Sequence, residues 1–208
     1  MTGVQTCALP ISSSSSDRQK FTISAWIKKS QFGSYQGFVQ ATCPNPPFAD
    51  SFDGLRWNSS DQLEFCARGG NDIYLVPNML FRDPSAWYHI VVAVDTTQAT
   101  STNRVKMYLN GSQITSFSSS SYPAQNYSNI MNSAVPHVFG KNADLSNEYF
   151  NGLMASTYFI DGQALTPSSF GETDATTGIW KPKSYSGTYG TNGFYLKFEN
   201  SEIGRAHV

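Results

Sequence analysis

The chain is a succession of short apolar segments separated by glycine, proline, asparagine and aspartate, and this punctuation limits its fold more than any other feature. Segments of this length with alternating or continuous apolar character are typical of strands, and signals for helices are almost absent. Enough of them are present for two packed sheets, so we expect an all-β fold, an antiparallel sandwich. The expected strands are Phe21 to Lys29, Gly37 to Thr42, Gly54 to Asn58, Gln62 to Ala67, Ile73 to Val76, Trp87 to Asp95, Arg104 to Asn110, Gln113 to Phe117, Pro136 to Lys141, Phe150 to Ile160 and Gly193 to Phe198.

Two of these segments indicate where they lie in the sandwich. From Phe21 to Ile27 every second residue is apolar, which makes one apolar face, and Trp26 projects to the opposite face. The segment from Tyr88 to Val94 is apolar on both faces. A strand of that kind is expected at the centre of a sheet that is covered on both sides.

Three turns have recognisable chemistry. Asn110-Gly111 predicts a tight hairpin, because both residues readily adopt a positive φ. The sequence from Arg82 to Ser85 predicts a turn that leads into the central strand. The sequence from Thr166 to Phe170 has an N-cap residue followed by proline, which predicts one short helical turn.

Charge and hydropathy exclude several kinds of partner. The 208 residues carry a formal net charge of -1, so nucleic acid and anionic membranes are not expected partners. No apolar run approaches the ~20 residues that a membrane-spanning helix needs. Charged residues and aromatic residues each make up 14% of the chain, a balance found in extracellular β-proteins with uncharged polar surfaces.

The two ends of the chain can be encoded by one short DNA segment and its reverse complement. Gln5 to Ile11 corresponds to one strand and Ile203 to Val208 to the other, and the DNA resembles a sequencing-library adapter. We therefore expect residues 1–12 and 202–208 to be adapter-derived ends of a metagenomic fragment and to lie outside the fold. Residues 13–20 are expected to form a serine-rich linker and residues 21–200 a single domain, whose end leads toward a missing next domain. Without the true N-terminus, a signal peptide cannot be identified.

The cysteines do not predict a disulfide framework. Cys43 and Cys66 remain once Cys7 is assigned to the adapter. The expected strand Gly54 to Asn58 lies between theirs, which would separate them by about 9–10 Å, too far for a disulfide. We expect free thiols, with a bridge left open if the loop from Pro44 to Pro47 folds back.

Longer stretches resemble a known family. These are FTISAWIKK, FRDPSAWYHIVVAVDTTQAT, RVKMYLNGSQIT and the segment from Ile160 to Phe198. Together they resemble laminin-G-like, concanavalin A-like modules of bacteriophage tail-fibre and virion structural proteins. The first stretches are common to the wider superfamily, and Ile160 to Phe198 is the more specific signature.

The resemblance implies a jelly-roll sandwich on a virion, outside any cell, as part of a fibre that is oligomeric. It also implies a non-catalytic module that binds glycans of the host surface through loops at the rim or through the concave sheet. Two alternatives stay open, because fold does not determine function. One is a spacer without a ligand, and the other is a glycoside hydrolase or polysaccharide lyase.

An enzyme would need a pair of carboxylates across a cleft. The related hydrolases carry E-x-D-x-x-E on one strand, and the nearest match here is Glu172-Thr173-Asp174 with Thr177 in the last acidic position. We therefore expect no catalysis by that motif. His89 and His137 have structural explanations as strand residues, and neither lies beside a sequence that marks a nucleophile.

Glycan binding requires aromatic side chains for the apolar faces of sugars and polar groups for their hydroxyls. The candidates beside polar loops are Trp57, Tyr74, Tyr127, Tyr149 and Asn71. The chain has 14 phenylalanines, 11 tyrosines and 4 tryptophans, most of which must fill the sandwich, so for each aromatic candidate taken singly we favour packing over sugar binding. Trp26 and Trp87 are expected to pack.

Calcium is the one cofactor that the resemblance implies, held in rim loops by carboxylates. Asp50, Asp53 and Asp72, with Asn71, have the chemistry for it. The same residue types are common in ordinary turns, and we favour the turn explanation over the calcium site.

Overall fold

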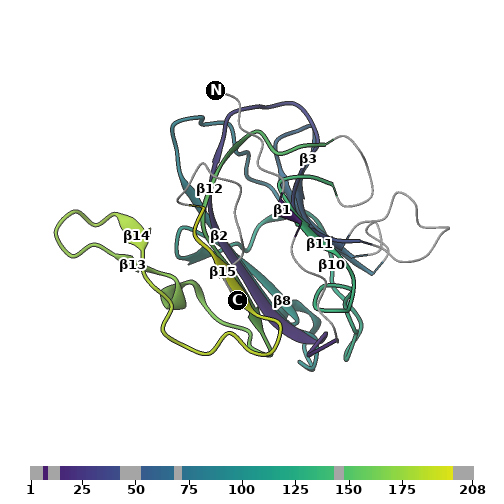
Figure 1. Cartoon of the computed structure of the whole chain (residues 1–208). Coiled ribbons are helices and arrows are strands. Elements are labelled where there is room, and N and C mark those ends of the chain that lie inside the picture. Colours follow the sequence, from purple (N-terminus) through teal and green to yellow (C-terminus); the bar gives the residue numbers. More distant parts are fainter. Residues whose placement is uncertain (1–6, 9–14, 43–52, 68–71, 143–147, 199–208) are drawn as a thin grey trace.

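The computed structural model describes residues 7–8, 15–42, 53–67, 72–142 and 148–198, and these form two antiparallel sheets that face each other (Figure 1). Sheet A has seven strands, in the order β1 (Cys7–Ala8), β11 (His137–Phe139), β3 (Gln36–Ala41), β4 (Asp53–Trp57), β5 (Leu63–Ala67), β6 (Ile73–Pro77) and β10 (Phe117–Ser121). Sheet B has six, in the order β15 (Phe194–Leu196), β12 (Gly152–Asp161), β2 (Lys20–Lys29), β7 (Tyr88–Asp95), β8 (Val105–Leu109) and β9 (Ser112–Gln113). The expected antiparallel sandwich is confirmed.

The expected strands are present, with ends that shift by a few residues, except at one place. The strand expected from Gln113 to Phe117 is divided between β9, at the edge of sheet B, and β10, at the edge of sheet A. Residues 114–116 therefore cross from one sheet to the other. Two 3-10 turns, Ser101–Asn103 and Pro167–Ser169, are present, and the second confirms the helical turn expected after Thr166. The structure contains no helix in the described residues that is long and apolar enough to cross a membrane.

The core lies between the sheets and is rich in aromatic rings. Phe21, Ile23, Ala25 and Ile27 of β2 are buried in it, as the alternation predicts. Trp57 lies at its centre, with ring centroids 5.6 Å from those of both Phe38 and Phe150. Burial of so much apolar surface is the main stabilising contribution to a fold of this size.

A second apolar layer explains why β7 is apolar on both faces. Val91 and Ala93 point away from the main core and pack in a separate buried cluster with Tyr108, Tyr158, Ile160 and Phe170. Leu165, Tyr185, Tyr189 and Tyr195 pack against that cluster. The segment after β12 thus folds back over part of the outer face of sheet B. The expected central, doubly covered strand is confirmed.

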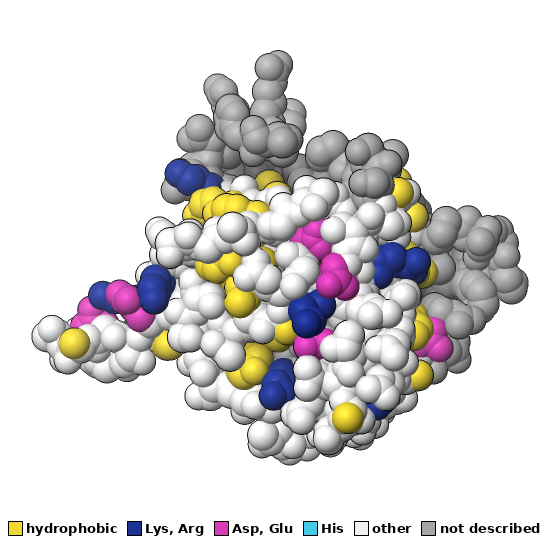
Figure 2. Space-filling view, turned by 90° about the horizontal axis from the view of Figure 1, so that it is seen from below, with side chains coloured by type: hydrophobic (Ala, Val, Ile, Leu, Met, Phe, Trp, Pro, Cys, Tyr) yellow, Lys and Arg dark blue, Asp and Glu magenta, His cyan; other side chains and the backbone are white. Residues whose placement is uncertain are grey.

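A two-stranded hairpin, β13 (Gly171–Thr173) and β14 (Trp180–Pro182), stands out from the sandwich on the side of sheet B (Figure 1). Seen from below that view, the hairpin carries side chains of both charges, and the rest of the visible surface is mostly uncharged (Figure 2). Trp180 anchors the hairpin, because its Nε1 donates a hydrogen bond of 2.9 Å to Nδ1 of His89 on β7. The sequence did not predict these two strands.

The N-terminal segment lies closer to the sandwich than expected. Cys7–Ala8, assigned to the adapter, forms the short strand β1 and pairs with β11. In the stretch expected to be a linker, Arg18 Nε donates a 2.6 Å hydrogen bond to the carbonyl oxygen of Asn129, and Ser16 N donates to Asn132. Residues 15–20 are therefore bonded to the domain and do not behave as a free linker.

The strand order that the argument about the cysteines assumes is confirmed. β4 lies between β3 and β5, and Cys66 is opposite Gly54. Cys66 is a buried free thiol. Burial, with the nearby Glu64 carboxylate, raises the pKa of the Cys66 thiol, which keeps it protonated. Cys43 is outside the described residues.

Candidate functional site

The burial of Trp57 and the exposure of Trp87 are the reverse of what the sequence predicts. Trp57 is 0% exposed in the core, so the expectation that it presents a face to a sugar is wrong. Alternation along β4 directs its ring inward. Trp87 is 39% exposed, so its assignment to packing is also wrong. Trp26 is 7% exposed and stacks on His89 with ring centroids 4.8 Å apart, which confirms its packing role.

The tyrosine candidates lie in different surroundings. Tyr74 donates a 3.0 Å hydrogen bond to Oε1 of Glu64, and Tyr127 donates one of 3.0 Å to Oδ2 of Asp72. Burial and the Glu64 carboxylate raise the pKa of Tyr74 to about 12, so its hydroxyl stays a donor to that carboxylate. Tyr149 is 45% exposed, and Asn71 is outside the described residues. The hydroxyls of Tyr74 and Tyr127 are thus each bonded to a carboxylate of the protein.

Tyr74 belongs to a polar cluster on the outer face of sheet A. Glu64 on β5 accepts hydrogen bonds from Arg56 Nε at 2.7 Å and Asn58 Nδ2 at 3.1 Å, besides the bond from Tyr74. The Arg56 guanidinium also lies 3.9 Å from Glu148 and stacks over the Tyr35 ring at 4.5 Å. Three donors thus occupy the oxygens of Glu64, and its side chain is 2% exposed. The polar groups of this cluster thus bond mainly to one another.

The two described carboxylates proposed for calcium, those of Asp53 and Asp72, each accept a hydrogen bond from another part of the chain. Asp53 is fully buried, and its Oδ2 accepts a hydrogen bond from Ile130 N at 3.1 Å. Asp72 is bonded to Tyr127. Within the described ranges, no three His, Cys, Asp or Glu side chains lie close enough together to hold a metal ion. Asp50 is outside these ranges, so the geometry that a calcium site needs is not shown for any candidate set.

His89 and His137 are both buried and hydrogen-bonded within the fold. Trp180 Nε1 can only donate, so Nδ1 of His89 accepts and its Nε2 carries the proton that is donated to Ser24 Oγ at 2.9 Å. This tautomer cannot take a proton from Ser24. His137 accepts from Asn132 N through Nε2 and bonds the Val135 carbonyl through Nδ1.

The acidic motif is a turn. Asp174 Oδ1 accepts bonds from the backbone nitrogens of Thr176 and Thr177, and its Oδ2 accepts from Lys181. These bonds close the loop between β13 and β14, in the way that aspartate commonly stabilises turns. The carboxylate does not face a cleft of the sandwich.

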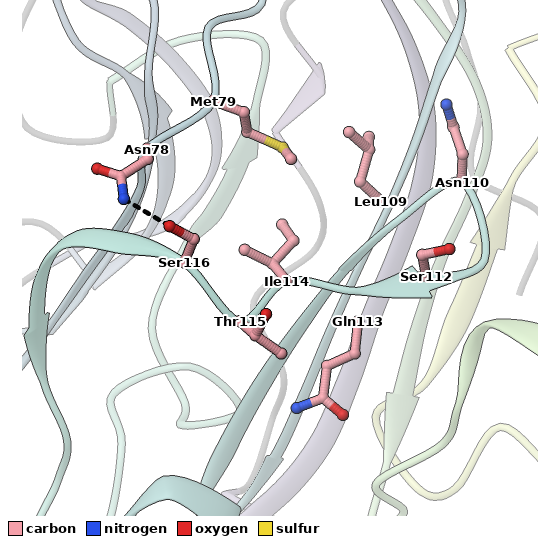
Figure 3. A pocket seen from close by; sticks show the side chains of 9 residues that line it. All are labelled: Asn78, Met79, Leu109, Asn110, Ser112, Gln113, Ile114, Thr115 and Ser116. Atoms are coloured by element: carbon pink, nitrogen blue, oxygen red, sulfur yellow. Dashed lines mark hydrogen bonds between the residues drawn. The ribbon is translucent and has the colours of Figure 1, made fainter.

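A groove lies where the chain crosses from sheet B to sheet A, and it has a volume of about 620 Å³. Its lining residues are Asn78, Met79, Leu109, Asn110, Ser112, Gln113, Ile114, Thr115 and Ser116. The Asn110-Gly111 hairpin forms one wall, and Asn110 has φ 47° and Gly111 has φ 85°, which confirms the predicted tight turn. Backbone and side-chain bonds between Asn78 and Ser116 fix the other wall (Figure 3).

The polar groups of the groove have hydrogen-bonding capacity to spare. Ser112, Gln113 and Thr115 are exposed and have no side-chain hydrogen bond in the described part of the chain. Asn110 accepts a 2.8 Å bond from His89 N through Oδ1, which holds the amide in place and leaves Nδ2 to donate. The groove therefore offers several donors and acceptors to a ligand.

Between these polar groups the groove has an apolar strip. The side chains of Met79, Leu109 and Ile114 form it (Figure 3). Ile114 is buried in the main core, so the 38% exposed Met79 and the half-buried Leu109 supply its accessible surface. The Trp180 ring packs behind the hairpin, because a Cβ added to Gly111 would lie 2.9 Å from it. None of the lining residues is charged. Such a surface suits a ligand that is neutral, rich in hydroxyls and apolar on one side.

Sequence reasoning missed this groove. The amides and hydroxyls from residues 112 to 116 read as an ordinary strand end, and only the crossing between sheets places them beside Asn78. The Asn110-Gly111 hairpin was the one local signal at the site.

Comparison with known proteins identifies the family of the fold. A family model, described as the concanavalin A-like lectin/glucanases superfamily (Laminin_G_3), matches residues 3–169. The match begins inside the stretch assigned to the adapter, and most of the segment from Ile160 to Phe198, expected to be the specific signature, follows it. No curated protein matches the chain.

Several solved structures are similar. Domain 4 of AbnA, a GH43 extracellular arabinanase from Geobacillus stearothermophilus, in complex with arabinotriose, is 20% identical with a TM-score of 0.52, and the alignment covers 77% of this chain and 68% of that one. A heptameric SAP-like pentraxin from Limulus polyphemus is 14% identical with a TM-score of 0.51, covering 75% and 70%.

A candidate carbohydrate-binding protein from Bacteroides ovatus is 16% identical with a TM-score of 0.54. The alignment covers 99% of this chain and 54% of that protein, so this chain spans about half its length. Identities this low show the shared fold alone. With a family model matching most of its length, the chain belongs to the concanavalin A-like lectin/glucanases superfamily.

Proposed function

We propose that the domain is a carbohydrate-recognition module that binds a neutral sugar in the groove beside the Asn110-Gly111 hairpin. One observation carries the proposal: the Gln113 amide and the Ser112 and Thr115 hydroxyls, which have no side-chain hydrogen bond in the described residues, flank an apolar strip, and no charged side chain lines the groove. Sugars combine hydroxyls with an apolar C–H face, so both parts of the groove have a counterpart on the ligand.

The proposed module is non-catalytic. The groove contains no carboxylate that would serve as acid, base or nucleophile in glycoside hydrolysis. Glu64 on sheet A and Glu148 in the segment before β12 both contact the Arg56 guanidinium, at 2.7 Å and 3.9 Å. The Glu64 side chain is 2% exposed and already accepts three hydrogen bonds, which does not favour contact with a substrate.

Binding in an open groove of this size is expected to be weak at a single site, and repeated copies on one assembly would raise it. A multimeric fibre would supply such repeated copies. The resemblance of Ile160 to Phe198 supports a virion tail or fibre protein that contacts host-surface glycans, outside the cell. The genes beside the one that encodes this chain test this setting, because neighbouring virion genes would support it and a catalytic domain in the same reading frame would contradict it.

Titration of the domain with a panel of neutral oligosaccharides, followed by calorimetry on the best binder, tests the groove. Gln113→Ala and Thr115→Val should each weaken binding about 3- to 10-fold, because each removes a hydrogen bond of about 1 kcal/mol. Ser120→Ala is the matched control, since Ser120 is exposed on β10 outside the groove.

Three outcomes would reject the proposal. No binding by a folded domain would favour the spacer, and release of sugar from a polysaccharide would establish an enzyme. Equal affinity in the groove variants and in Ser120→Ala would place binding elsewhere.

A further inference from the structure

One end of the outer face of sheet B is left uncovered and carries an exposed tryptophan. Lys28 lies opposite Leu153 in the pairing of β2 with β12, and Ile27 lies opposite Tyr88 in the pairing of β2 with β7. Ile27 and Tyr88 point into the core, so alternation places Trp87, Lys28 and Leu153 on the outer face. Lys28 is on β2, Leu153 is on β12 and Trp87 directly precedes β7, and we call these three residues the tryptophan row.

Trp87 and Leu153 of the tryptophan row are exposed, whereas the side chains of the next row on the same face are buried. Trp87 is 39% exposed and Leu153 is 57% exposed. In the next row toward the hairpin, Trp26 is 7% exposed, and His89 is buried between the Trp26 and Trp180 rings. The cover over sheet B therefore ends between these two rows.

The row is too small for a stable protein interface. At 39% exposure, Trp87 offers roughly 100 Å² of the ~250 Å² of a tryptophan side chain. Leu153 adds a comparable or smaller area, whereas a specific interface buries about 800 Å² on each partner. An area of this size matches the face of one or two sugar rings.

Lys28 gives the row a polar group. Its ammonium has no ion pair or hydrogen bond in the described residues, and the Asp83 carboxylate nearby accepts instead from the backbone and hydroxyl of Ser85. An ammonium next to an indole face suits a sugar that presents an apolar face and an oxygen acceptor at its edge.

We propose that the tryptophan row is a second carbohydrate-binding surface, on which a sugar ring stacks against Trp87 and accepts a hydrogen bond from Lys28. The proposal extends the proposed function to a separate surface and rests on it for the class of ligand. The acceptor is a hydroxyl in a neutral polysaccharide and a carboxylate in one that contains uronic acids.

Tryptophan fluorescence can test this surface directly, because the other three tryptophans are buried or half-buried. The probes are linear arabinan, which is neutral, and alginate, which contains uronic acids. A polysaccharide bound at the row should protect Trp87 from acrylamide quenching. Trp87→Phe should abolish this ligand-dependent protection and retain most of the affinity, since a phenyl ring still stacks.

Variants measured by calorimetry give the second readout. Trp87→Ala should weaken binding about 5- to 10-fold. Ile179→Ala is the control, because it removes an apolar side chain that is 65% exposed on the projecting hairpin. Lys28→Gln should weaken alginate binding more than arabinan binding if the carboxylate is the acceptor, and both about equally if a hydroxyl is. Thermal unfolding of each variant checks that the fold is retained.

The groove variants separate this inference from the proposed function. Binding that is weakened by Trp87→Ala supports the tryptophan row, whether or not Gln113→Ala also weakens it. Binding that depends on Gln113 and is unchanged in Trp87→Ala overturns the row and leaves the groove. If neither polysaccharide binds the folded domain at millimolar concentration, the row is overturned for both ligand sources, and the oligosaccharide panel still decides the groove.

Discussion

Lys29 and Asp61 form an ion pair that joins the two sheets. Lys29 ends β2 in sheet B and Asp61 lies in the turn between β4 and β5 of sheet A, with side chains 0% and 4% exposed. The Asp61 carboxylate also accepts bonds from Gly33 N at 2.9 Å and Arg82 Nε at 3.0 Å. Burial alone would raise the pKa of Asp61, but the bonds from Gly33, Arg82 and Lys29 outweigh it and lower the pKa. Ionised Asp61 therefore stabilises the fold above its ordinary pKa, and this contribution is lost as the pH falls through the lowered value.

Asp61→Asn should lower the free energy of unfolding by about 3–5 kcal/mol, because the buried Lys29 ammonium would lose its countercharge. Urea unfolding at neutral pH measures the loss. The double variant Lys29→Met/Asp61→Asn should recover part of the stability, since it removes both charges. A loss under 1 kcal/mol in Asp61→Asn would mean that water reaches Lys29 and that the pair is not buried in solution.

His89 makes the free energy of unfolding depend on pH. Burial lowers the pKa of His89 to about 4, below its usual value of about 6.5. The unfolded chain therefore binds a proton at a higher pH than the folded one, so stability falls as the pH drops from about 6.5 to about 4. This shift corresponds to about 3 kcal/mol. Protonation would also remove the acceptor for Trp180 at Nδ1.

His89→Asn should reduce the slope of unfolding free energy against pH between about 6.5 and 4. An asparagine oxygen can replace Nδ1 as the acceptor for Trp180 and does not titrate. Some slope should persist, because burial also lowers the pKa of His137. Urea unfolding at a series of pH values measures it, and an unchanged slope in His89→Asn would show that His89 is not buried as a neutral ring.

At the scale of elements, the β8–β9 hairpin both contacts the projecting β13–β14 hairpin and forms part of the groove wall. Its turn needs positive φ at both Asn110 and Gly111, and the Gly111 backbone lies against the Trp180 ring of the projecting hairpin. The same turn positions Asn110 in the groove wall. A change at Gly111 should therefore affect both the stability of the hairpin and binding.

Gly111→Ala should destabilise the domain by about 1–2 kcal/mol from backbone strain, plus a further cost for displacing Trp180. Gly178→Ala is the matched control, because Gly178 has φ 72° and a Cβ there would meet nothing within 4 Å. The difference between the two variants in thermal unfolding measures the contact with Trp180. Equal losses would contradict the close approach of Trp180 to the hairpin.

At the scale of the whole molecule, the sandwich separates its charged groups from the proposed binding groove. The cluster of Arg56, Glu64 and Glu148 lies on the outer side of sheet A, and the carboxylates of Asp53 and Asp72 accept hydrogen bonds from Ile130 N and the Tyr127 hydroxyl. The groove at the crossing between the sheets has no charged lining residue. We therefore predict that the proposed sugar binding in the groove does not depend on a metal ion.

Removal of divalent ions with EDTA should leave the affinity of the groove for sugar within about 2-fold of its value in calcium. Calorimetry with the best neutral oligosaccharide, in buffer with EDTA and in buffer with calcium chloride, checks this. A loss of binding in EDTA that calcium restores would place the ligand at a metal site and contradict the groove as the binding surface.

Local sequence patterns determined the strands and several turns. The alternation from Phe21 to Ile27 has the period of a strand with one buried face, and Asn110-Gly111 favours positive φ whatever the surroundings. Both signals depend on covalent geometry and neighbouring residues alone, so they could be predicted. The all-β sandwich followed from them.

Tertiary structure decided which face of each strand is covered. Trp57 and Trp87 both lie on or beside strands near polar turns, yet one is buried and the other is 39% exposed. The difference arises because β4 turns Trp57 toward the opposing sheet, whereas the segment that covers sheet B ends before Trp87. The groove depends in the same way on the crossing that brings Gln113 beside residues about 35 positions earlier in the chain. Alternation fixes that two faces differ, but the face that meets solvent is set by contacts between residues far apart in sequence.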